Sequence, residues 1–283
     1  MFTWLYKRIA RYSILIASFF AGNNYFHKTI YQGKLKGFFF PGLNCYACPL
    51  ARFSCPLGSM QNFIAVKTFP VYVLGFMGIL GIMLGRLVCG WVCPFGFFQE
   101  ILYRIKSLKI RVSQKHSYSK YLILFILAIV LPILTSEPWF CKLCPAGGIE
   151  AGIPMVALDT SLRNLIGILF YIKMAIVVIL VSSSILIKRP FCRFVCPLGA
   201  IYGIFNKFTF FKIQVDENKC IECYACQNVC PMDIEIFKVP ESVDCIRCGE
   251  CIKACPTNAL SFKYGIYSSF KSPLSKNANK STL

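Results

Sequence analysis

Two stretches near the C-terminus repeat one cysteine spacing, and this spacing limits the possible folds more than any other feature of the chain. The stretches are CIECYACQNVCP, from position 220, and CIRCGECIKACP, from position 245. Both follow the pattern C-x2-C-x2-C-x3-C-P, in which three cysteines bind one [4Fe–4S] cluster and the fourth binds its neighbour. The spacing therefore predicts one cluster on Cys220, Cys223, Cys226 and Cys255, and a second on Cys245, Cys248, Cys251 and Cys230.

A zinc ribbon is the alternative interpretation of closely spaced cysteines. Zinc sites use pairs of close cysteines and have no need of a third ligand two residues further on, so the two full runs favour clusters. We expect residues 212–267 to form a separate α+β ferredoxin domain of the bacterial two-cluster type. Residues 268–283, rich in Ser, Lys and Asn, are expected to be a loose tail.

The rest of the chain has the composition of a membrane protein. Of its 283 residues, 56% are hydrophobic, and apolar runs cover residues 9–25, 69–88, 121–134 and 165–187. A membrane span needs about 20 apolar residues. We therefore expect residues 1–211 to form an α-helical membrane domain with four transmembrane helices. The basic N-terminus resembles the start of a signal peptide, and we expect it to remain as an anchor.

The net charge of +19 does not indicate nucleic-acid binding, because its distribution is that of a membrane protein. Eight of the twelve acidic residues lie between positions 216 and 250, whereas the basic excess flanks the apolar runs. Lys and Arg collect in cytoplasmic loops. The pattern predicts a multi-pass protein of the bacterial or archaeal inner membrane, with both termini and the ferredoxin domain in the cytoplasm.

The membrane part carries a second cysteine repeat. The segments CGWVCPFG at 89–96 and CRFVCPLG at 192–199 share the pattern C-x3-C-P-x-G and lie 103 residues apart. Each follows a long apolar run, so the membrane part reads as a tandem repeat of a two-helix unit, and like sites should meet on one side. We expect Cys89, Cys93, Cys192 and Cys196 to hold an iron–sulfur cluster at the inner face.

A further group of cysteines is predicted at the outer face. Cys45 and Cys48 correspond to Cys141 and Cys144, 96 residues later. The four can hold another cluster, and Cys55 is a fifth candidate, which either replaces one of them or is spare. Two alternatives remain open, because buried cysteines also act as small apolar residues and because an oxidising outer face would permit a disulfide.

Lys173 is a charged residue within the fourth apolar run. A cation at the centre of a membrane helix costs about 2.5–3.5 kcal/mol, so it should face a partner, a cavity or a cofactor. Contact with a quinone or relay of a proton is the functional interpretation. The alternative is a structural contact with a polar group on a neighbouring helix.

The cysteine segments together resemble the NapH-type membrane iron–sulfur proteins, in the wider group that includes the NosR membrane module. The matching segments are NCYACPLARFSCPLGSMQ at 44–61, RLVCGWVCPFG at 86–96, RPFCRFVCPLGA at 189–200 and the two ferredoxin runs. The resemblance covers nearly the whole chain. It implies a four-helix quinol dehydrogenase subunit of anaerobic respiration, which passes electrons from membrane quinol to a periplasmic iron–sulfur protein or cytochrome.

Two other functions fit the same residues. One is a conduit without quinone, between a cytoplasmic electron donor and a periplasmic acceptor. The other is a cluster-bearing sensor or assembly factor. A quinone requirement in the purified protein distinguishes the quinol dehydrogenase from both.

Overall fold

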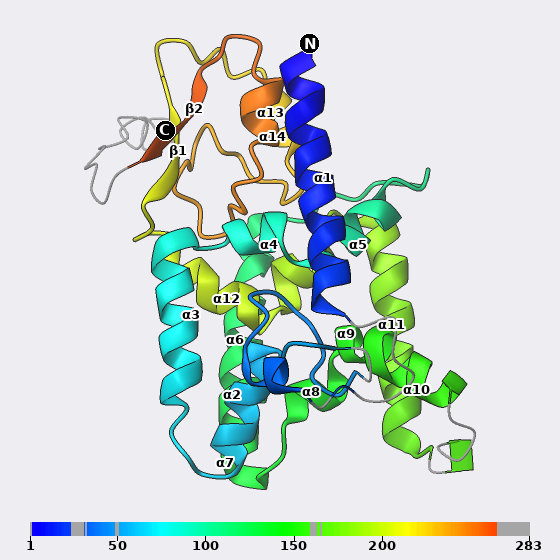
Figure 1. The fold of residues 1–283 in the computed structure, drawn as a ribbon. Helices are drawn as coiled ribbons and strands as arrows, with labels where there is room; N and C mark the ends of the chain where they lie inside the picture. The colour runs from blue at the N-terminus through cyan, green and yellow to red at the C-terminus, as the bar shows by residue number, and fades with distance from the viewer. Residues whose placement is uncertain are drawn as a thin grey trace, which may run out of the picture.

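The structure is a computed structural model that describes residues 2–23, 31, 33–48, 51–158, 163–164 and 166–264. Helices form its lower part in Figure 1, and a small ferredoxin fold lies at the upper end, beside the N-terminal half of the first helix. The predicted tail at 268–283 lies outside the described residues.

Four apolar helices dominate the helical part. They are α1 (Phe2–Gly22), α3 (Val71–Leu84), the continuous α6 (Ser119–Phe125), η3 (Ile126–Val130) and α7 (Leu131–Thr135), and α11 (Ile168–Leu186). By length and composition, two segments among the described residues are candidate membrane spans: Gln114–Thr135 and Ile168–Leu186, with mean hydropathies of 2.0 and 2.3. Ile9–Gly22 and Val71–Leu84 are shorter apolar helices. The structure therefore offers two candidate spans where the sequence predicted four.

The second apolar run does not form one helix, contrary to its uninterrupted hydropathy. Helix α3 ends at Leu84, Gly85 adopts a φ of +54°, and a new short helix, α4 (Leu87–Trp91), begins two residues later. With a ψ of −133°, Gly85 lies outside the left-handed region that other residues can reach, so a single glycine redirects the chain. The break brings Arg86 and Cys89 into the protein interior.

We expect Gly85→Ala to destabilise the protein by about 1–3 kcal/mol, because it combines strain at positive φ with overpacking. An added Cβ would lie 2.5 Å from Asn206 Oδ1 and 2.7 Å from Arg247 Nη1. Thermal unfolding in one detergent measures the effect. Gly75→Ala is the matched control, since nothing lies within 4 Å of its Cβ position and alanine favours a helix interior by about 1 kcal/mol. Equal melting temperatures for the two variants would contradict the prediction.

The helix that contains the third apolar run is longer than the run itself. The helical path starts with η2 (Gln114–Tyr118), ahead of the expected 121–134, and passes through the π-helical η3 just before Pro132. Proline lacks an N–H and clashes with the carbonyl four residues earlier. A π-helical turn changes the local hydrogen-bond register and allows the helix to continue past Pro132.

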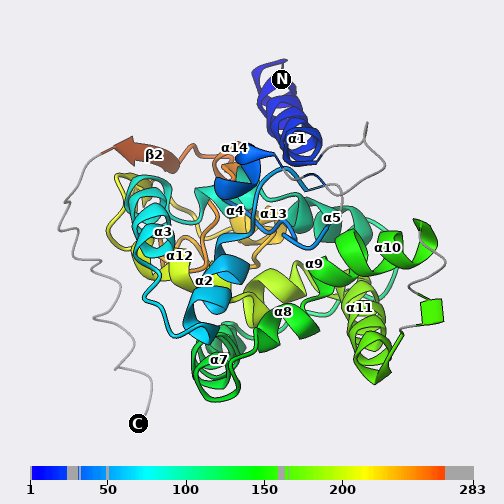
Figure 2. The same cartoon turned by 60° about the horizontal axis from the view of Figure 1, so that its bottom comes forward.

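Short segments between the long helices carry the cysteines. Figure 2 shows α2, α8, α9 and α12 grouped between α3 and α11. Four of the short helices begin with a proline directly after a cysteine: α2 (Pro56–Ala65), α5 (Pro94–Tyr103), α9 (Pro145–Gly147) and α12 (Pro197–Phe205). Further short helical segments among the described residues are η1 (Lys34–Gly37), α8 (Trp139–Leu143), η4 (Gly148–Gly152), α10 (Ile153–Leu158) and η6 (Phe191–Val195).

The ferredoxin fold is closed by two antiparallel strands. Strand β1 (Phe211–Val215) pairs with β2 (Leu260–Tyr264), and Ile213 lies opposite Phe262. Between the strands lie the two cysteine runs and the helices α13 (Ala225–Val229) and α14 (Glu250–Ala254). Each run turns into its helix through a left-handed residue, Tyr224 in one and Gly249 in the other. The fold is thus α+β.

The ferredoxin fold packs tightly on the helical part. A Cβ at Gly90 would lie 2.5 Å from Ile246 O, so only glycine fits at this approach. The indole of Trp91 donates to Arg247 O at 3.2 Å, and the Arg247 guanidinium donates to Leu84 O at 3.1 Å. One hydrophobic core extends across both parts. The ferredoxin fold is therefore continuous with the helical part.

Candidate iron–sulfur sites

The ferredoxin cysteines surround two separate cavities. The first cavity is lined by Cys220, Cys223, Cys226 and Cys255, and the second by Cys230, Cys245, Cys248 and Cys251. These are the two sets that the spacing predicted. The fourth cysteine of each run crosses to the other set because the short helices α13 and α14 pack against one another.

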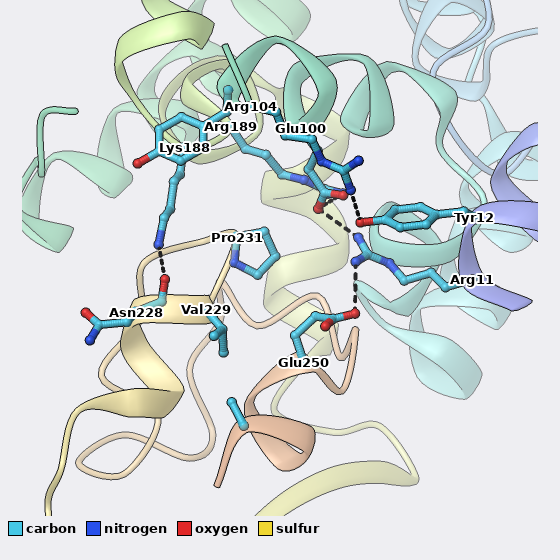
Figure 3. A pocket seen from close by; sticks show the side chains of 12 residues that line it. Arg11, Tyr12, Glu100, Arg104, Lys188, Arg189, Asn228, Val229, Pro231 and Glu250 are labelled. Carbon is cyan, nitrogen blue, oxygen red and sulfur yellow. Dashed lines mark hydrogen bonds and ion pairs between the residues drawn. The ribbon is translucent and has the colours of Figure 1, made fainter. Parts of the chain in front are cut away.

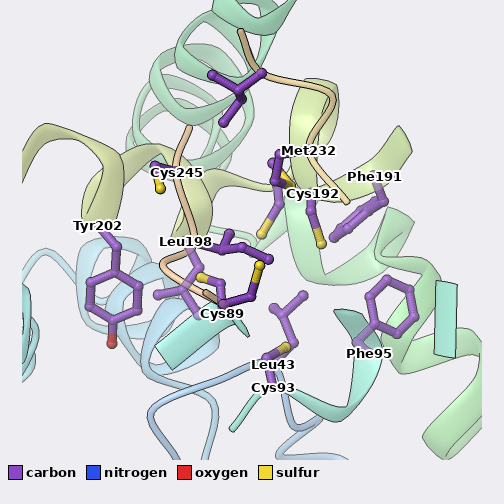
Figure 4. Close-up of a cluster of buried hydrophobic side chains, with 14 of the residues drawn as sticks. Leu43, Cys89, Cys93, Phe95, Phe191, Cys192, Leu198, Tyr202, Met232 and Cys245 are labelled. Atoms are coloured by element: carbon purple, nitrogen blue, oxygen red, sulfur yellow. The ribbon is translucent and has the colours of Figure 1, made fainter. Parts of the chain in front are cut away.

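The four cysteines that the sequence assigned to the inner face come together in the buried core; we call this group the inner site. Cys89, Cys93, Cys192 and Cys196 are each at most 9% exposed and belong to one apolar cluster. Figure 4 shows the first three around Leu43 and Leu198. Burial raises the pKa of the Cys196 thiol, and the other three thiols raise it further, because like charges repel at short range. Cysteines that lie 103 residues apart in the sequence thus share one site.

Two arginines brace the inner site reciprocally. Arg86 Nη2 donates to Cys192 O at 2.9 Å, and Arg189 Nη1 donates to Cys89 O at 3.0 Å. Each arginine lies three residues before a cysteine of its own segment and bonds to the corresponding cysteine of the other segment. Both are at most 1% exposed. Sequence reasoning missed them, although the shared pattern R-x2-C-x3-C-P-x-G was the available signal.

At the outer site the structure groups a set of four cysteines that differs by one member from the four that the sequence placed there first. The cavity is lined by Cys45, Cys55, Cys141 and Cys144, whereas Cys48 is not part of the lining. Burial is the largest cause that raises the pKa of the Cys141 thiol, and the nearby Cys55, Cys144 and Cys45 raise it further. Cys48 instead donates through Sγ to Glu150 O at 2.9 Å and packs with Ala51 and Ala151. Cys55, the fifth candidate, therefore takes the position that the repeat had assigned to Cys48.

The pattern Cys-Pro-x-Gly has a local structural reason. In all four copies the cysteine is the N-cap of a helix and the proline follows at the first helical position. At Cys196 the N–H of Gly199 also donates to the cysteine sulfur. The bond measures 3.3 Å from Gly199 N to Cys196 Sγ. Proline is favoured there because its missing N–H would have no helical partner. Each copy therefore presents one sulfur at a helix start.

The glycines of these segments also leave space for the opposing cysteine segment of the same chain. A Cβ at Gly147 would lie 3.2 Å from Cys45 Sγ, and one at Gly58 would lie 3.5 Å from Cys141 Sγ. At the inner site the corresponding contacts are with the two arginines: Gly96 with Arg189 at 2.9 Å, and Gly199 with Arg86 at 3.1 Å. The glycines allow the two halves of each site to approach closely.

The donor sets fit iron–sulfur clusters. None of the seventeen cysteines, all of which lie in described residues, forms a disulfide. Burial raises the pKa of Cys55 to about 11 and that of Cys93 to about 12, so without a metal these thiols are neutral at pH 7. Metal binding converts thiols to thiolates and releases protons. Four thiols per site form the complete ligand set of one [4Fe–4S] cluster.

The thiols are spread around their sites. Within the described ranges, no group of three or more His, Cys, Asp or Glu side chains converges as the ligands of one metal ion do. The four cysteines of a [4Fe–4S] cluster bind four different irons, so a cluster site does not require that convergence.

The sites follow one another through the molecule. Leu43 lines the outer cavity, and a Cβ at the preceding Gly42 would lie 3.0 Å from Cys93 Cα of the inner site. The fully buried Tyr202 lies between the two sites: burial raises the pKa of its hydroxyl, and so do thiols of both sites, Cys89 and Cys55 foremost. On the other side, Gly90 of the inner segment contacts Ile246, which is next to Cys245.

A network of ion pairs joins α1, α5 and the ferredoxin fold around a cavity of about 290 Å³ (Figure 3). Arg11 bonds to Glu100 at 2.8 Å and lies 3.6 Å from Glu250, while Arg189 Nη2 lies 2.7 Å from Glu100. Burial works to raise the pKa of Glu100, but the two arginines outweigh it and lower the pKa. The carboxylate therefore stays ionised and holds both arginines.

Lys173 lies in the second turn of α11 and not at the middle of a span, because the helix begins only at Ile168. A Cβ at Gly147 would lie 3.6 Å from Lys173 Nζ and 3.2 Å from Cys45 Sγ, so the ammonium group is at the outer site. The lysine is half-buried, and its neighbours Tyr171 and Ile172 are exposed. Lys173 therefore lies between the outer thiols and the surface of the helical part.

The sequence matches families of iron–sulfur proteins. Residues 68–113, 121–153 and 169–215 match a family described as a 4Fe-4S binding domain, and residues 212–256 match a 4Fe-4S dicluster domain. An uncharacterized protein of Methanocaldococcus jannaschii is 35% identical over 222 residues, which cover 74% of this chain and 86% of that protein.

Two bacterial relatives carry more specific names. The ferredoxin-type protein NapH of Haemophilus influenzae is 25% identical over 83% of this chain and 76% of its own length. The methylamine utilization ferredoxin-type protein MauN of Methylobacillus flagellatus is 24% identical over 57% of this chain and 52% of its own. No solved structure matches significantly.

The fold and its thiol-lined sites define an iron–sulfur electron-transfer protein, in which a two-cluster ferredoxin domain is joined to a membrane-associated helical part. Its matches to 4Fe-4S binding and 4Fe-4S dicluster domains show that it binds [4Fe–4S] clusters. The chain belongs to the NapH-type polyferredoxin family, as its cysteine segments indicated.

Proposed function

We propose that this protein passes electrons between the membrane quinone pool and redox partners through four [4Fe–4S] clusters. The observation that carries the proposal is that sixteen of the seventeen cysteines gather in four groups of four, arranged one after another. Each cluster, when bound, takes up and releases one electron. Because the series extends from the outer site to the ferredoxin fold, it supports electron transfer across most of the molecule. The proposal places this series in a multi-pass membrane protein whose ferredoxin domain lies in the cytoplasm.

The protein's own residues hold this series in place. The Cys-Pro-x-Gly helix starts fix one sulfur each, and the reciprocal arginines lock the two inner segments together. The segment from Pro41 to Cys45 runs between the outer and inner sites, anchored by Tyr202, whose hydroxyl donates to Pro41 O at 3.1 Å. Burial excludes water from the inner thiols. Fixed, dry surroundings minimise the reorganisation that accompanies electron transfer.

Lys173 is our candidate for contact with the quinone. Its ammonium group lies beside the outer thiols, and the helix surface around it is exposed where lipid would lie. An ammonium group can donate a hydrogen bond to a quinone oxygen, and it can take a proton from a quinol only after it has given up one of its own. The location favours quinol oxidation near the outer site.

Metal content and quinol reduction test the proposal together. The full chain, purified anaerobically in detergent, should contain about sixteen irons and as many acid-labile sulfides, four per site. A short-chain quinol should reduce the clusters, as followed by EPR. About eight irons would confine the clusters to the ferredoxin fold and contradict the proposal.

Lys173→Met tests the quinone contact. We expect quinol to reduce the clusters about tenfold more slowly, which corresponds to a loss of about 1.4 kcal/mol of stabilisation, while the iron content stays the same. Lys67→Met, in the exposed turn after α2, is the control and should leave the rate unchanged. Full cluster content without any reduction by quinol would favour the conduit without quinone, or a sensor or assembly factor.

A further inference from the structure

We propose that Gln61 and Gln99 are matched positioning residues, each of which tunes the reduction potential of one membrane cluster through a hydrogen bond to a ligand sulfur. Gln61 acts on the outer site and Gln99 on the inner site. The inference rests on the proposed function, because it requires clusters at both sites.

Gln99 makes the contact at the inner site. It lies in α5 and has no exposed surface. Its Nε2 donates to Cys192 Sγ at 3.2 Å and to Phe95 O at 3.2 Å, while its Oε1 accepts the backbone N–H of Phe191 at 3.1 Å. One side chain therefore fixes the opposing segment and directs an N–H at the sulfur of that segment.

Gln61 repeats this arrangement at the outer site. It lies in α2 and is also fully buried. Its Nε2 donates to Cys141 Sγ at 3.6 Å, and its Oε1 accepts the N–H of Phe140 at 3.1 Å. In both sites the accepted N–H belongs to the phenylalanine directly before the cysteine. The two sites therefore share the same contact between a buried glutamine and a Phe-Cys pair.

The sequence places both glutamines by the same rule. Each is the last residue of the pattern C-P-x-G-x2-Q, at 55–61 and at 93–99. The other two Cys-Pro-x-Gly segments have Glu150 and Tyr202 at this position. Glu150 accepts the N–H of Cys45 at 2.7 Å, and Tyr202 donates to a carbonyl. Each membrane site therefore receives one amide donor at this position, always from the first of its two Cys-Pro-x-Gly segments.

The direction of the effect follows from charge. Reduction adds an electron to a cluster, and part of the added charge falls on its sulfurs. A hydrogen-bond donor stabilises the more negative state, so it raises the reduction potential. The bond is stronger in a buried site, where water does not compete. Removing the amide should therefore make the reduced state harder to form.

Gln99→Met and Gln61→Met test the inference in the full, anaerobically purified chain. We expect each variant to lower the reduction equilibrium constant of one cluster about tenfold, which is about 59 mV for a one-electron couple. The two variants should shift different clusters. An EPR-monitored redox titration measures the potentials, and iron analysis verifies that all clusters are present.

Two further variants separate tuning from folding. Gln114→Met removes an amide that donates to the carbonyls of Met232 and Asp233. The reduction potentials of the inner-site and outer-site clusters should therefore stay unchanged. Gln99→Glu keeps an oxygen that can accept the Phe191 N–H but loses the amide donor. It should lower the inner potential with the cluster retained, even where Gln99→Met loses iron.

The possible failures are distinguishable. About sixteen irons with unshifted potentials in Gln61→Met, Gln99→Met and Gln99→Glu would overturn this inference and leave the proposed function intact. The inference would also be overturned, and the proposed function left intact, if Gln61→Met and Gln99→Met both shifted the reduction potential of the same cluster. About eight irons in the unmodified chain would overturn the proposed function and this inference with it.

Discussion

Replacing Cys55 with alanine should remove the outer cluster, about four of roughly sixteen irons, whereas Cys48→Ala should leave the iron content unchanged. Cys55 lines the outer cavity with three other thiols, and it is the N-cap residue of α2. Cys48 is equally buried but directs its sulfur at Glu150 O. Losing that one bond costs about 1 kcal/mol.

Iron and sulfide analysis of the two variants, purified side by side without oxygen, measures the difference. The pair is well matched, because both cysteines are buried, both belong to the segment 45–55, and the substitution is the same. EPR should show one signal missing in Cys55→Ala and all signals present in Cys48→Ala. Loss of iron in Cys48→Ala with retention in Cys55→Ala would show that the ligand set is the one the repeat first indicated.

Asp244→Asn should destabilise the joined structure by about 3–5 kcal/mol, the cost of breaking a buried ion pair from one side. Asp244 accepts from Arg86 Nη1 at 2.5 Å and from Ser117 Oγ at 2.5 Å, and it forms an ion pair with Lys120. Arg86 and Lys120 are both fully buried. The substitution would leave two buried cations without a counter-charge, at the place where the ferredoxin fold meets the helical part.

Thermal unfolding and limited proteolysis measure this effect, with early release of a ferredoxin fragment as the expected sign. Glu241→Gln is the control: its ion pair with Lys212 is at the surface, where Glu241 is 51% exposed, and such pairs contribute at most about 1 kcal/mol. Equal stability of the two variants would contradict the assignment of Asp244 as the central charge of the interface.

The same carboxylate makes the interface sensitive to acid. Burial works to raise the pKa of Asp244, but Arg86 and Lys120 outweigh it and hold the pKa below its ordinary value. Because the folded pKa is lower than the unfolded one, the ionised group stabilises the fold at any pH above the unfolded value of about 4. This contribution is lost as the pH falls through the folded pKa, and Asp244→Asn should lack it.

The helical boundaries show how far hydropathy alone can be used. The apolar run at 69–88 gives no sign that the chain turns at Gly85, since glycine is common in membrane helices. The turn exists because Arg247 and Asn206 pack against the residues around it. Similarly, the run at 121–134 contains only the apolar part of its helix, which begins at Gln114. Polar helix ends that face the ferredoxin fold carry no hydropathy signal.

Within a single segment, the sequence determined the chemistry of this protein. Three cysteines in a C-x2-C-x2-C run can reach one cluster because a short turn spans its corners. Cys-Pro-x-Gly places a cysteine at a helix start because proline is favoured at the first helical position. Family membership, confirmed by the comparisons, rested on such local patterns.

Only the tertiary structure decided which distant segments meet. Cys48 and Cys55 are both local neighbours of Cys45. Only Cys55 has the Cys-Pro-x-Gly pattern, but a local pattern does not say which distant cysteines its sulfur will meet. The packing of α2 against the segment around Cys141 brings Cys55 into the outer cavity and turns Cys48 toward Glu150. The reciprocal arginines and the two glutamines likewise act across about 80–106 residues of sequence. Such contacts depend on how helices pack, because side chains far apart in sequence constrain one another only after the chain has folded.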